Sequence, residues 1–277
     1  MPDLVRLRQS TAPAPIRLAL LAFDLAAYEV LYRFSAVRRR RFFNGGFLPI
    51  SPDFQFLPPL AGEDASAMMY HLLLRDMVAG LSPAPTAILD VGSGQGGGLL
   101  YAHHLYPDAH LLGTDRNGTV TRKAARAFAH LSTARFVKGR GDRINFPDAS
   151  ADFVISVGAP TYFGLPTYVA EAARCCRSGG IIAFSGGYRQ GDIAEIEKEL
   201  RLAAARNGLK FHAFRNITPH TFAALQADIP RREAEVANVP WPIRLYARKW
   251  ADLPGSAEYD EYVNGQRADF AAVMTKP

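Results

Sequence analysis

The chain has 277 residues, of which 48% are hydrophobic, enough for one sizeable core. Its two cysteines, Cys175 and Cys176, are adjacent, which excludes a framework of loop-closing disulfides; we expect them to be small apolar core residues in a reducing compartment. The seven histidines form no ligand-spaced pair with a cysteine, so no metal site is expected.

The formal net charge of +6 comes mainly from arginine, with one run from Arg38 to Arg41. A single run is typical of a solvated helix end or of a contact with an acidic surface. It lacks the repeated basic and aromatic stripe of a nucleic-acid groove, so we expect no nucleic-acid partner.

The most apolar stretch begins at Ile16 and is interrupted by Asp24 and Glu29. It is therefore shorter than the ~20 apolar residues that a membrane span needs. No secretory cleavage signature follows it, so the sequence predicts a cytoplasmic protein. The helix expected over residues 16–43 ends in the arginine run, and it either packs over a core or makes peripheral contact with an anionic membrane.

Residues 1–85 are predicted to form an N-terminal helical cap. Residues 1–15 should be frayed, because Pro13 and Pro15 favour extended backbone. The helix over 16–43 is followed by a connection rich in Pro, Gly and Phe over 44–62. A second helix is expected over 64–81, where apolar residues recur at helical spacing.

From Thr86 the sequence alternates between short apolar strands and helices. Strands are expected over residues 87–91, 110–115, 134–138, 151–157 and 181–185, and helices over 99–106, 120–130 and 168–177. This alternation predicts a parallel sheet with helices on both faces and a ligand at the carboxyl ends of the strands.

The final part of the core, which we expect to span residues 86–277, is less regular. A helix is predicted over 193–207, a strand over 210–217 and a closing strand over 268–275. Between the last two strands, residues 218–250 are predicted to form a helical insertion interrupted by Pro230, Pro240 and Pro242. The insertion is too polar for a separate core and is expected to cap the site.

A glycine-rich loop follows the first strand of this core. Gly92, Gly94 and Gly97 fit the dinucleotide-binding spacing, whereas Gly92, Gly94 and Gly96 fit the version found in methyltransferases. Both versions let the backbone turn tightly and approach a ligand closely.

Three acidic residues help to separate these alternatives. Asp90 precedes the loop, where a carboxylate can meet the ammonium group of a methionine moiety but offers nothing to a pyrophosphate. Asp115 ends the second strand and can accept both hydroxyls of a ribose, which suits either cofactor. Asp142 follows the third strand and can accept a hydrogen bond from an adenine amino group.

Together these segments resemble the motif series of class I S-adenosylmethionine-dependent methyltransferases, in order and spacing. The resemblance is carried by residues 88–96, Thr114-Asp115, Gly141-Asp142 with Phe146-Pro147-Asp148, and Ser178-Gly179-Gly180. More narrowly, residues 43–47, Tyr70-His71, residues 94–98, Asp115-Arg116-Asn117 and residues 255–259 resemble the phthiotriol and phenolphthiotriol dimycocerosate methyltransferases and related polyketide O-methyltransferases.

The resemblance implies an α/β Rossmann-like sheet of seven strands, the last antiparallel, with N-terminal helices and a helical cap. It also implies S-adenosylmethionine as cofactor and methyl transfer to a hydroxyl group. The implied cofactor-binding residues are Tyr70, Asp90, Gly92, Ser93, Gly94, Gly96, Asp115, Arg116, Asn117, Gly141, Asp142, Arg143 and Ser156.

The loop after the fourth strand departs from the family pattern. Related enzymes often carry a histidine there that can act as the base, but residues 156–163 contain neither histidine nor carboxylate. Either His71 takes the proton, with His220 a weaker candidate, or an acidic acceptor such as a phenol or enol needs no protein base. Tyr162 is expected to orient the acceptor hydroxyl.

Aromatic residues gather in the segments expected to form the cap, which predicts a hydrophobic acceptor pocket. They are Phe42, Phe43, Phe47, Phe54, Phe56, Tyr162, Phe163, Trp241 and Trp250. The predicted function is methylation of a hydroxyl on a hydrophobic small molecule or lipid in secondary metabolism. The alternatives are a C- or N-methyltransferase, a dehydrogenase that uses NAD, and a non-catalytic cofactor-binding module, and the oligomeric state is left open.

Overall fold

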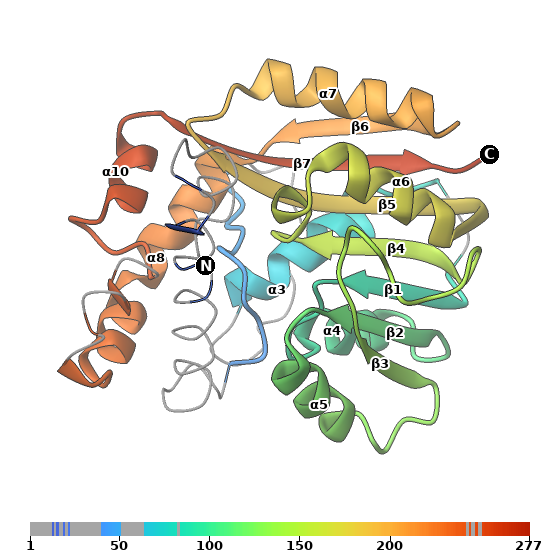
Figure 1. The fold of residues 1–277 in the computed structure, drawn as a ribbon, viewed down its shortest axis with the longest axis horizontal. Coiled ribbons are helices and arrows are strands. Elements are labelled where there is room, and N and C mark those ends of the chain that lie inside the picture. The colour runs from blue at the N-terminus through green and yellow to red at the C-terminus, as the bar shows by residue number, and fades with distance from the viewer. Residues whose placement is uncertain are drawn as a thin grey trace. The chain divides into compact units, whose positions relative to one another are not determined.

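A mixed sheet of seven strands organises the described part of the chain (Figure 1). The computed structural model describes residues 13, 15–16, 19, 22, 40–50, 64–81, 84–241, 244, 247–248 and 251–277. The strands are β1 (Ala87–Val91), β2 (His110–Asp115), β3 (Ala134–Lys138), β4 (Ala151–Val157), β5 (Cys176–Arg189), β6 (Lys210–Asn216) and β7 (Arg267–Thr275). Their order across the sheet is β3-β2-β1-β4-β5-β7-β6.

The described helices precede the first strand or connect successive strands along the chain (Figure 1). They are α3 (Asp64–His71), the π-helix η2 (Leu72–Asp76), α4 (Gly97–Leu105), α5 (Gly118–Ala127), the 3-10 helix η3 (Pro160–Tyr162), α6 (Leu165–Cys175), α7 (Ile193–Arg206), α8 (Thr218–Ala237) and α10 (Ala257–Val263). Among the residues that the structure describes, no helix combines the length and apolar character needed to cross a membrane.

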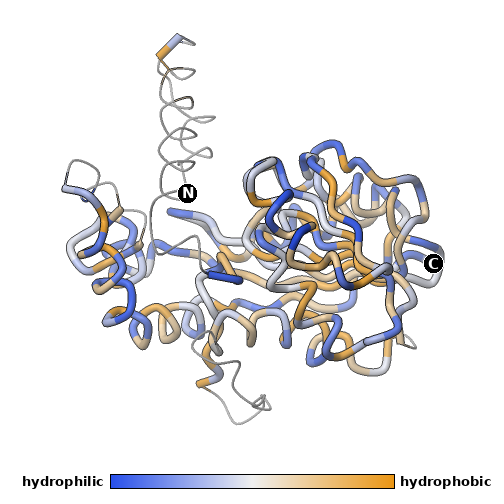
Figure 2. Tube along the Cα trace, turned by 90° about the horizontal axis from the view of Figure 1, so that it is seen from below, coloured by the Kyte–Doolittle hydropathy of each residue, from blue (hydrophilic) through white to orange (hydrophobic). Residues whose placement is uncertain are grey.

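Alternation along the buried strands divides the core into two layers. Ile88 joins α3 and α4 in one apolar cluster, whereas its neighbour Leu89 joins α6 and α7 in the other. Figure 2 shows the apolar stretches gathered in the strands of this region. Cys175 and Cys176 are buried and free in the second layer, as predicted.

The directions of the strands define the edge of the sheet at which a ligand is expected to bind. Strands β1 to β5 pair in parallel, so their carboxyl ends share that edge, while β7 runs antiparallel to both β5 and β6. The predicted fold, including an antiparallel last strand, is confirmed.

Several predicted boundaries are wrong. The helix expected over 64–81 is α-helical only to His71, continues as the π-helix η2 to Asp76 and ends in turns over residues 77–81. Residues 178–180, which lie between the helix predicted over 168–177 and the strand predicted over 181–185, belong to β5, which bulges where its register with β4 shifts. The sequence pattern predicts no helix between residues 251 and 266, yet α10 lies there.

The N-terminal predictions lie mostly outside the described residues. Residues 40–43 are not helical, so the prediction of a helix that reaches residue 43 is wrong. The described residues 44–50 are irregular, as expected from their composition. Phe54, Phe56 and Trp250 lie outside the described residues.

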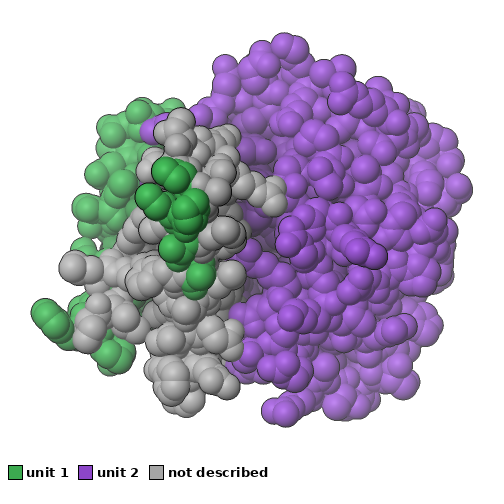
Figure 3. Space-filling model, in the orientation of Figure 1, with its two compact units in different colours: residues 1–40, 225–266 green, residues 41–224, 267–277 purple. Residues whose placement is uncertain are grey.

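The chain divides into two compact units, coloured in Figure 3. The larger unit comprises residues 41–224 and 267–277 and contains the whole sheet. The smaller comprises residues 1–40 and 225–266, including the second half of α8 and α10, with an apolar cluster of its own.

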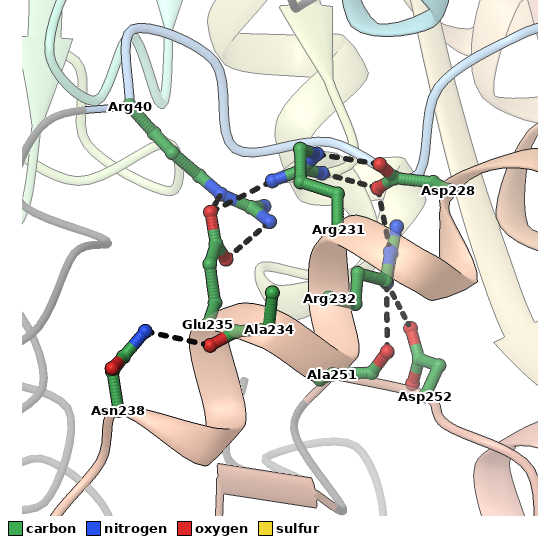
Figure 4. Close-up of polar contacts among 9 residues, drawn as sticks. All are labelled: Arg40, Asp228, Arg231, Arg232, Ala234, Glu235, Asn238, Ala251 and Asp252. Carbon is green, nitrogen blue, oxygen red and sulfur yellow. Dashed lines mark hydrogen bonds and ion pairs between the residues drawn. The ribbon is translucent and has the colours of Figure 1, made fainter.

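An ion-pair network holds the smaller unit together internally (Figure 4). Glu235 accepts hydrogen bonds from Arg40 at 2.9 Å and from Arg231 at 2.9 Å, and Asp228 pairs with both Arg231 and Arg232. Arg232 is buried and also donates to the Ala251 carbonyl. Burial lowers the pKa of Arg40, which the bond to Glu235 opposes.

Candidate cofactor and active site

The glycine-rich loop joins β1 to α4 at the carboxyl edge of the sheet. The Gly92 and Ser93 amides both donate to the Thr114 carbonyl, at 2.8 and 3.0 Å, which ties the loop to β2. Gly92 has φ of +83°, and a Cβ there would lie 2.5 Å from Ala159 Cβ. Glycine at this position therefore lets the loop pass against the turn that follows β4.

Asp90 is fully buried at the end of β1. Its Oδ2 accepts a hydrogen bond from the Tyr70 hydroxyl at 3.4 Å, and its Oδ1 has no hydrogen-bond partner among the described residues. Burial raises the pKa of Asp90 to about 8, although the Tyr70 bond opposes this rise. The free protein therefore holds a carboxyl group here that a cationic ligand would ionise.

Tyr70 is positioned by contact between α3 and α4. A Cβ at Gly98 would overlap the Tyr70 ring, so the ring lies directly on the α4 backbone. Burial raises the pKa of Tyr70 well above its usual value, so the phenol stays protonated and donates to Asp90. The resemblance assigns Tyr70 and Asp90 to one site, and the structure brings them together.

Asp115 ends β2 and closes on the same loop. Its carboxylate accepts from the Gly94 amide at 3.0 Å and from the Asn117 amide at 2.8 Å. Burial raises its pKa, while these two amide bonds oppose the rise. The side chain is thus held at the loop by bonds that a ribose hydroxyl would have to replace or share.

Arg116 and Asn117 directly follow Asp115, and their side chains make different contacts. The Asn117 side chain caps α5 by accepting from the Thr119 amide at 2.8 Å and the Val120 amide at 3.3 Å. Arg116 is partly buried, and its charge also opposes the rise in the pKa of Asp115. Asn117 therefore has a helix-capping task in addition to its predicted place beside a cofactor.

The turn after β3 carries Gly141, Asp142 and Arg143. Asp142 accepts two hydrogen bonds from Arg140, at 2.8 and 2.5 Å, and this pair raises the pKa of Arg140. A Cβ at Gly141 would overlap the Phe163 ring, so the turns after β3 and β4 are in contact. The Arg143 side chain is exposed, and its amide donates to the Arg140 carbonyl.

Ser156 lies inside the sheet. It is fully buried, and its Oγ donates to the Val91 carbonyl at 2.5 Å, which joins β4 to β1 next to the glycine loop. Its side chain therefore supports the strand that leads into the loop. This contact could not be predicted from the sequence, because it depends on β4 pairing beside β1.

The turn after β4 forms the 3-10 helix η3. Tyr162 ends η3 and is partly buried, with its amide donating to the Ala159 carbonyl at 3.1 Å. Thr161 is buried, and a Cβ at Gly186 would lie 2.8 Å from its methyl group. The turn therefore lies against the carboxyl end of β5.

His71 is buried at the end of α3 and faces helical partners. Its Nδ1 is within hydrogen-bond distance of the Tyr101 hydroxyl, at 3.0 Å, whereas its Nε2 lies 3.2 Å from Asp76 Oδ1 in an ion-pair contact without hydrogen-bond geometry. Burial lowers the pKa of His71, although Asp76 opposes this, and burial raises the pKa of Asp76. Both ring nitrogens face partners within the helical layer, which favours a structural task over the predicted role as base.

His220 also has backbone partners. It lies in the first turn of α8, with Nδ1 3.1 Å from the Leu48 carbonyl oxygen and 3.3 Å from the Ile50 amide nitrogen. Its ring stacks on Phe47 at a centroid distance of 4.7 Å. His220 thus fastens residues 47–50 to α8.

Three further polar groups lie in or next to the glycine loop, and only Ser93 is among the predicted site residues. Ser93 Oγ, Gln95 Nε2 and Thr114 Oγ1 are buried and have no hydrogen-bond partner among the described residues. An unpaired buried polar group costs about 1–3 kcal/mol, so such a cluster is typical of a place where a ligand completes the bonding. Gln95 could have been predicted as a site residue from its position between Gly94 and Gly96 in the glycine motif.

The aromatic residues predicted to line the acceptor pocket have different surroundings. Phe42 and Phe47 are buried in the larger unit, and the Phe42 ring lies 5.8 Å from that of Tyr70. A Cβ at Gly94 would lie 3.8 Å from Phe43, so this ring lies over the glycine loop. Trp241 is 80% exposed in the described structure.

Comparison with known proteins agrees with this geometry. A model of the methyltransferase domain family matches residues 88–180. The chain is 28% identical over 171 residues to the probable phthiotriol/phenolphthiotriol dimycocerosates methyltransferase 2 of Mycobacterium ulcerans, a match that covers 61% of this chain and only 64% of that protein. It is 25% identical over 245 residues to the fatty-acid O-methyltransferase of Mycolicibacterium smegmatis, covering 85% and 84%.

A solved structure shares the fold. It is the geranyl diphosphate C-methyltransferase of Streptomyces coelicolor, determined in complex with Mg²⁺, geranyl diphosphate and S-adenosyl-L-homocysteine. The TM-score is 0.62 at 15% identity, with 91% of this chain and 98% of that chain covered. These matches, the sheet order and the glycine loop with its two acidic strand ends show a methyltransferase domain over residues 88–180 on a Rossmann-like sheet, and the cofactor of this domain is S-adenosylmethionine.

Proposed function

We propose that the protein transfers the methyl group of S-adenosylmethionine to an oxygen atom of a hydrophobic small molecule, such as a polyketide, a phenol or a lipid. The observation that carries the proposal is the buried Asp90 carboxyl with one unpartnered oxygen beside the glycine loop. The names of the two curated relatives, which describe methyltransferases of lipids, support a hydrophobic acceptor.

The residues around the loop fit an amino-acid moiety on the cofactor. Asp90 Oδ1 is an acceptor suited to an ammonium group, and Gln95 Nε2 is a donor suited to a carboxylate. Asp115 would hold the ribose hydroxyls, and Asp142 the adenine, after partial release from Arg140. Gly92, Gly94 and Gly96 keep the backbone open to close approach.

When bound, S-adenosylmethionine supplies a methyl group on a sulfonium, which is already a good leaving group. The protein's own contribution is then mainly to orient the acceptor and to exclude water, which can supply up to ~7–11 kcal/mol for well-aligned reactants. In this proposal Tyr162, on the turn after β4, orients the acceptor hydroxyl, and Phe43 and Phe163 shield the site.

The proposal has two versions, which differ in how the acceptor hydroxyl loses its proton. An aliphatic alcohol needs a base, for which the sequence offers His71; a phenol needs less help. A second candidate acceptor is the carboxylate of a fatty acid, which is ionised at neutral pH and needs no base. It is favoured because both ring nitrogens of His71 face protein partners and because residues 156–163 contain no histidine or carboxylate.

The test is a substrate panel with methyl-labelled S-adenosylmethionine. Product should form with lipophilic phenols, polyketide alcohols or fatty acids, and the label should reside on oxygen. Label on carbon or nitrogen would favour the C- or N-methyltransferase alternative, and robust labelling of RNA or protein would contradict the proposal. A protein that binds the cofactor without labelling any acceptor would instead be a binding module.

Cellular location belongs to the same proposal. We infer that the enzyme works in the cytoplasm on acceptors that partition into membranes. The helix expected over residues 16–43 lies largely outside the described residues, so its contact with a membrane stays a prediction.

A further inference from the structure

A short basic and aromatic segment stands out in the smaller unit. Residues 238–251 contain both tryptophans of the chain, together with Arg244, Arg248 and Lys249, and no aspartate or glutamate. Of these residues, Trp241, Arg244, Ala247 and Arg248 are described as helical. The segment therefore carries a local positive charge within a chain whose acidic residues lie elsewhere.

The exposed side chains share one helical face. Trp241, Arg244 and Arg248 are exposed and are spaced three and four residues apart, which places them on the same side of a helix with 3.6 residues per turn. Ala247 is buried and joins an apolar cluster with Val236 and Leu253. The segment thus has an anchored side and an outward side that carries one indole and two guanidinium groups.

These two arginines differ from the other arginines that the structure describes in the same unit. Arg40, Arg231 and Arg232 are all paired with carboxylates (Figure 4). Arg244 bonds only neutral carbonyls, those of Ala237 and Val239, and Arg248 bonds the Pro254 carbonyl. Among the described residues, their charges thus have no acidic partner and are available to an external anionic surface.

Trp241 is 80% exposed, more than any other large hydrophobic residue described in this protein. Tryptophan is favoured at the level of lipid headgroups, where its ring is partly apolar and its N–H is solvated. Arginine side chains at that depth extend their cations toward the phosphates while their stems cover apolar surface. One exposed indole and two cations that have no acidic partner among the described residues match the headgroup layer of an anionic bilayer.

We propose that Trp241, Arg244 and Arg248 form a docking surface for an anionic lipid bilayer, which the protein contacts peripherally through this face. The inference does not depend on the identity of the acceptor or on methyl transfer. It assigns to these three described residues a membrane contact separate from the one predicted for residues 16–43.

Co-sedimentation of the full-length protein with lipid vesicles tests the proposal. The protein should bind vesicles that contain phosphatidylglycerol, bind weakly to pure phosphatidylcholine, and be released at high salt because screening shortens the range of the attraction. The double variant Arg244→Glu/Arg248→Glu should lose about tenfold or more in affinity, since each basic residue near an anionic surface contributes appreciably.

A matched control is Arg122→Glu/Arg126→Glu on α5, where two exposed arginines are also four residues apart. It changes the net charge equally and should retain vesicle binding within about twofold. Equal loss in both double variants would mean that net charge alone drives binding and would overturn the proposal. Unchanged vesicle binding of Arg244→Glu/Arg248→Glu would show that this face does not contact the membrane and would also overturn the proposal.

Trp241 gives a direct readout that does not require a charge change. In Trp250→Phe it is the one remaining tryptophan, and its emission should shift to the blue on vesicle binding and be quenched by brominated phosphatidylcholine. If Trp250→Phe does not fold, Trp241→Ala should weaken co-sedimentation while retaining the helical circular dichroism of the parent. An emission shift that depends on protein concentration without vesicles would show a second copy to be the occupant and overturn the proposal.

Discussion

The Tyr70 hydroxyl donates a hydrogen bond to Asp90 Oδ2 over 3.4 Å, in a site where both side chains are buried. One residue comes from α3, outside the predicted core, and the other from the end of β1. This bond links the N-terminal helical segment to the residue that we propose meets the ammonium group of the cofactor.

Cofactor binding should release a proton. Burial raises the pKa of Asp90 to about 8, so its carboxyl is protonated at neutral pH in the free protein, whereas an ammonium ligand favours the carboxylate. The affinity for S-adenosylhomocysteine should therefore rise up to about tenfold per pH unit below this pKa and then level off. Calorimetry in buffers of different ionisation enthalpy measures the proton released, and no release at neutral pH would contradict the assignment.

Asp90→Asn should change how stability depends on pH. The folded pKa lies above the unfolded value of 3.8, so between these values the native state keeps a proton that the unfolded chain has lost. The parent should thus lose up to about 1.4 kcal/mol of unfolding free energy per pH unit as pH rises through this range. The variant has no titrating carboxyl at this position and lacks this loss. The Tm of Asp90→Asn relative to that of the parent should therefore rise from acidic pH to about pH 8. A constant difference between the two proteins would be inconsistent with a buried, titrating Asp90.

Tyr70→Phe should move the pH dependence of cofactor binding to higher pH. The variant keeps the ring against Gly98 but loses the donor that lowers the pKa of Asp90. The midpoint of the affinity profile should rise. Tyr106→Phe is the matched control, since its hydroxyl donates to the Leu74 carbonyl and not to Asp90, and equal shifts in both variants would argue against the Tyr70 contact.

Gly98→Ala should weaken cofactor binding through Tyr70. The added Cβ would overlap the Tyr70 ring and must displace it from Asp90. We expect a lower Tm and about a tenfold loss of S-adenosylhomocysteine affinity, in the range for overpacking of about 1–3 kcal/mol. Gly45→Ala, where nothing lies within 4 Å of the added Cβ, should be neutral, and similar behaviour of the two variants would show that the Tyr70 position is unimportant.

His71→Ala separates a base from a structural residue. The sequence-based hypothesis expects turnover to fall ~10²–10⁴-fold and the parent's rate to rise as the imidazole loses its proton. The contacts with Tyr101 and Asp76 instead favour a fall in Tm, because removal of the ring leaves the buried Tyr101 hydroxyl without this partner. Turnover measured well below Tm decides between them: retention of more than half supports the structural role, and a loss above about a hundredfold supports the base.

The sequence predicts what depends on local pattern. The alternation of strands and helices indicates the sheet. Asp90 and Asp115 could be predicted to lie at the carboxyl edge of the sheet, because each stands at the end of a strand next to a glycine or a turn. The position of the glycine loop follows in the same way, whereas the antiparallel direction of β7 was expected only from the family resemblance.

Side-chain partners could not be predicted, because they depend on how the strands and turns meet in the folded protein. Ser156 donates to the Val91 carbonyl, a contact that requires β4 to pair beside β1. Gly141 meets the Phe163 ring only because the turns after β3 and β4 come together. Tyr70 and His71 are neighbours on one helix, but successive helical residues point in different directions, so their side chains meet different partners.

Methyl transfer itself is tested most directly by incubating the protein with S-adenosylmethionine that carries a deuterated methyl group and a panel of lipophilic phenols, polyketide alcohols and fatty acids. Mass spectrometry should find the label on an acceptor oxygen, with an equal amount of S-adenosylhomocysteine, and Asp90→Ala should abolish both. Label confined to carbon, nitrogen, RNA or protein, or no S-adenosylhomocysteine with any hydrophobic acceptor, would contradict the proposed function.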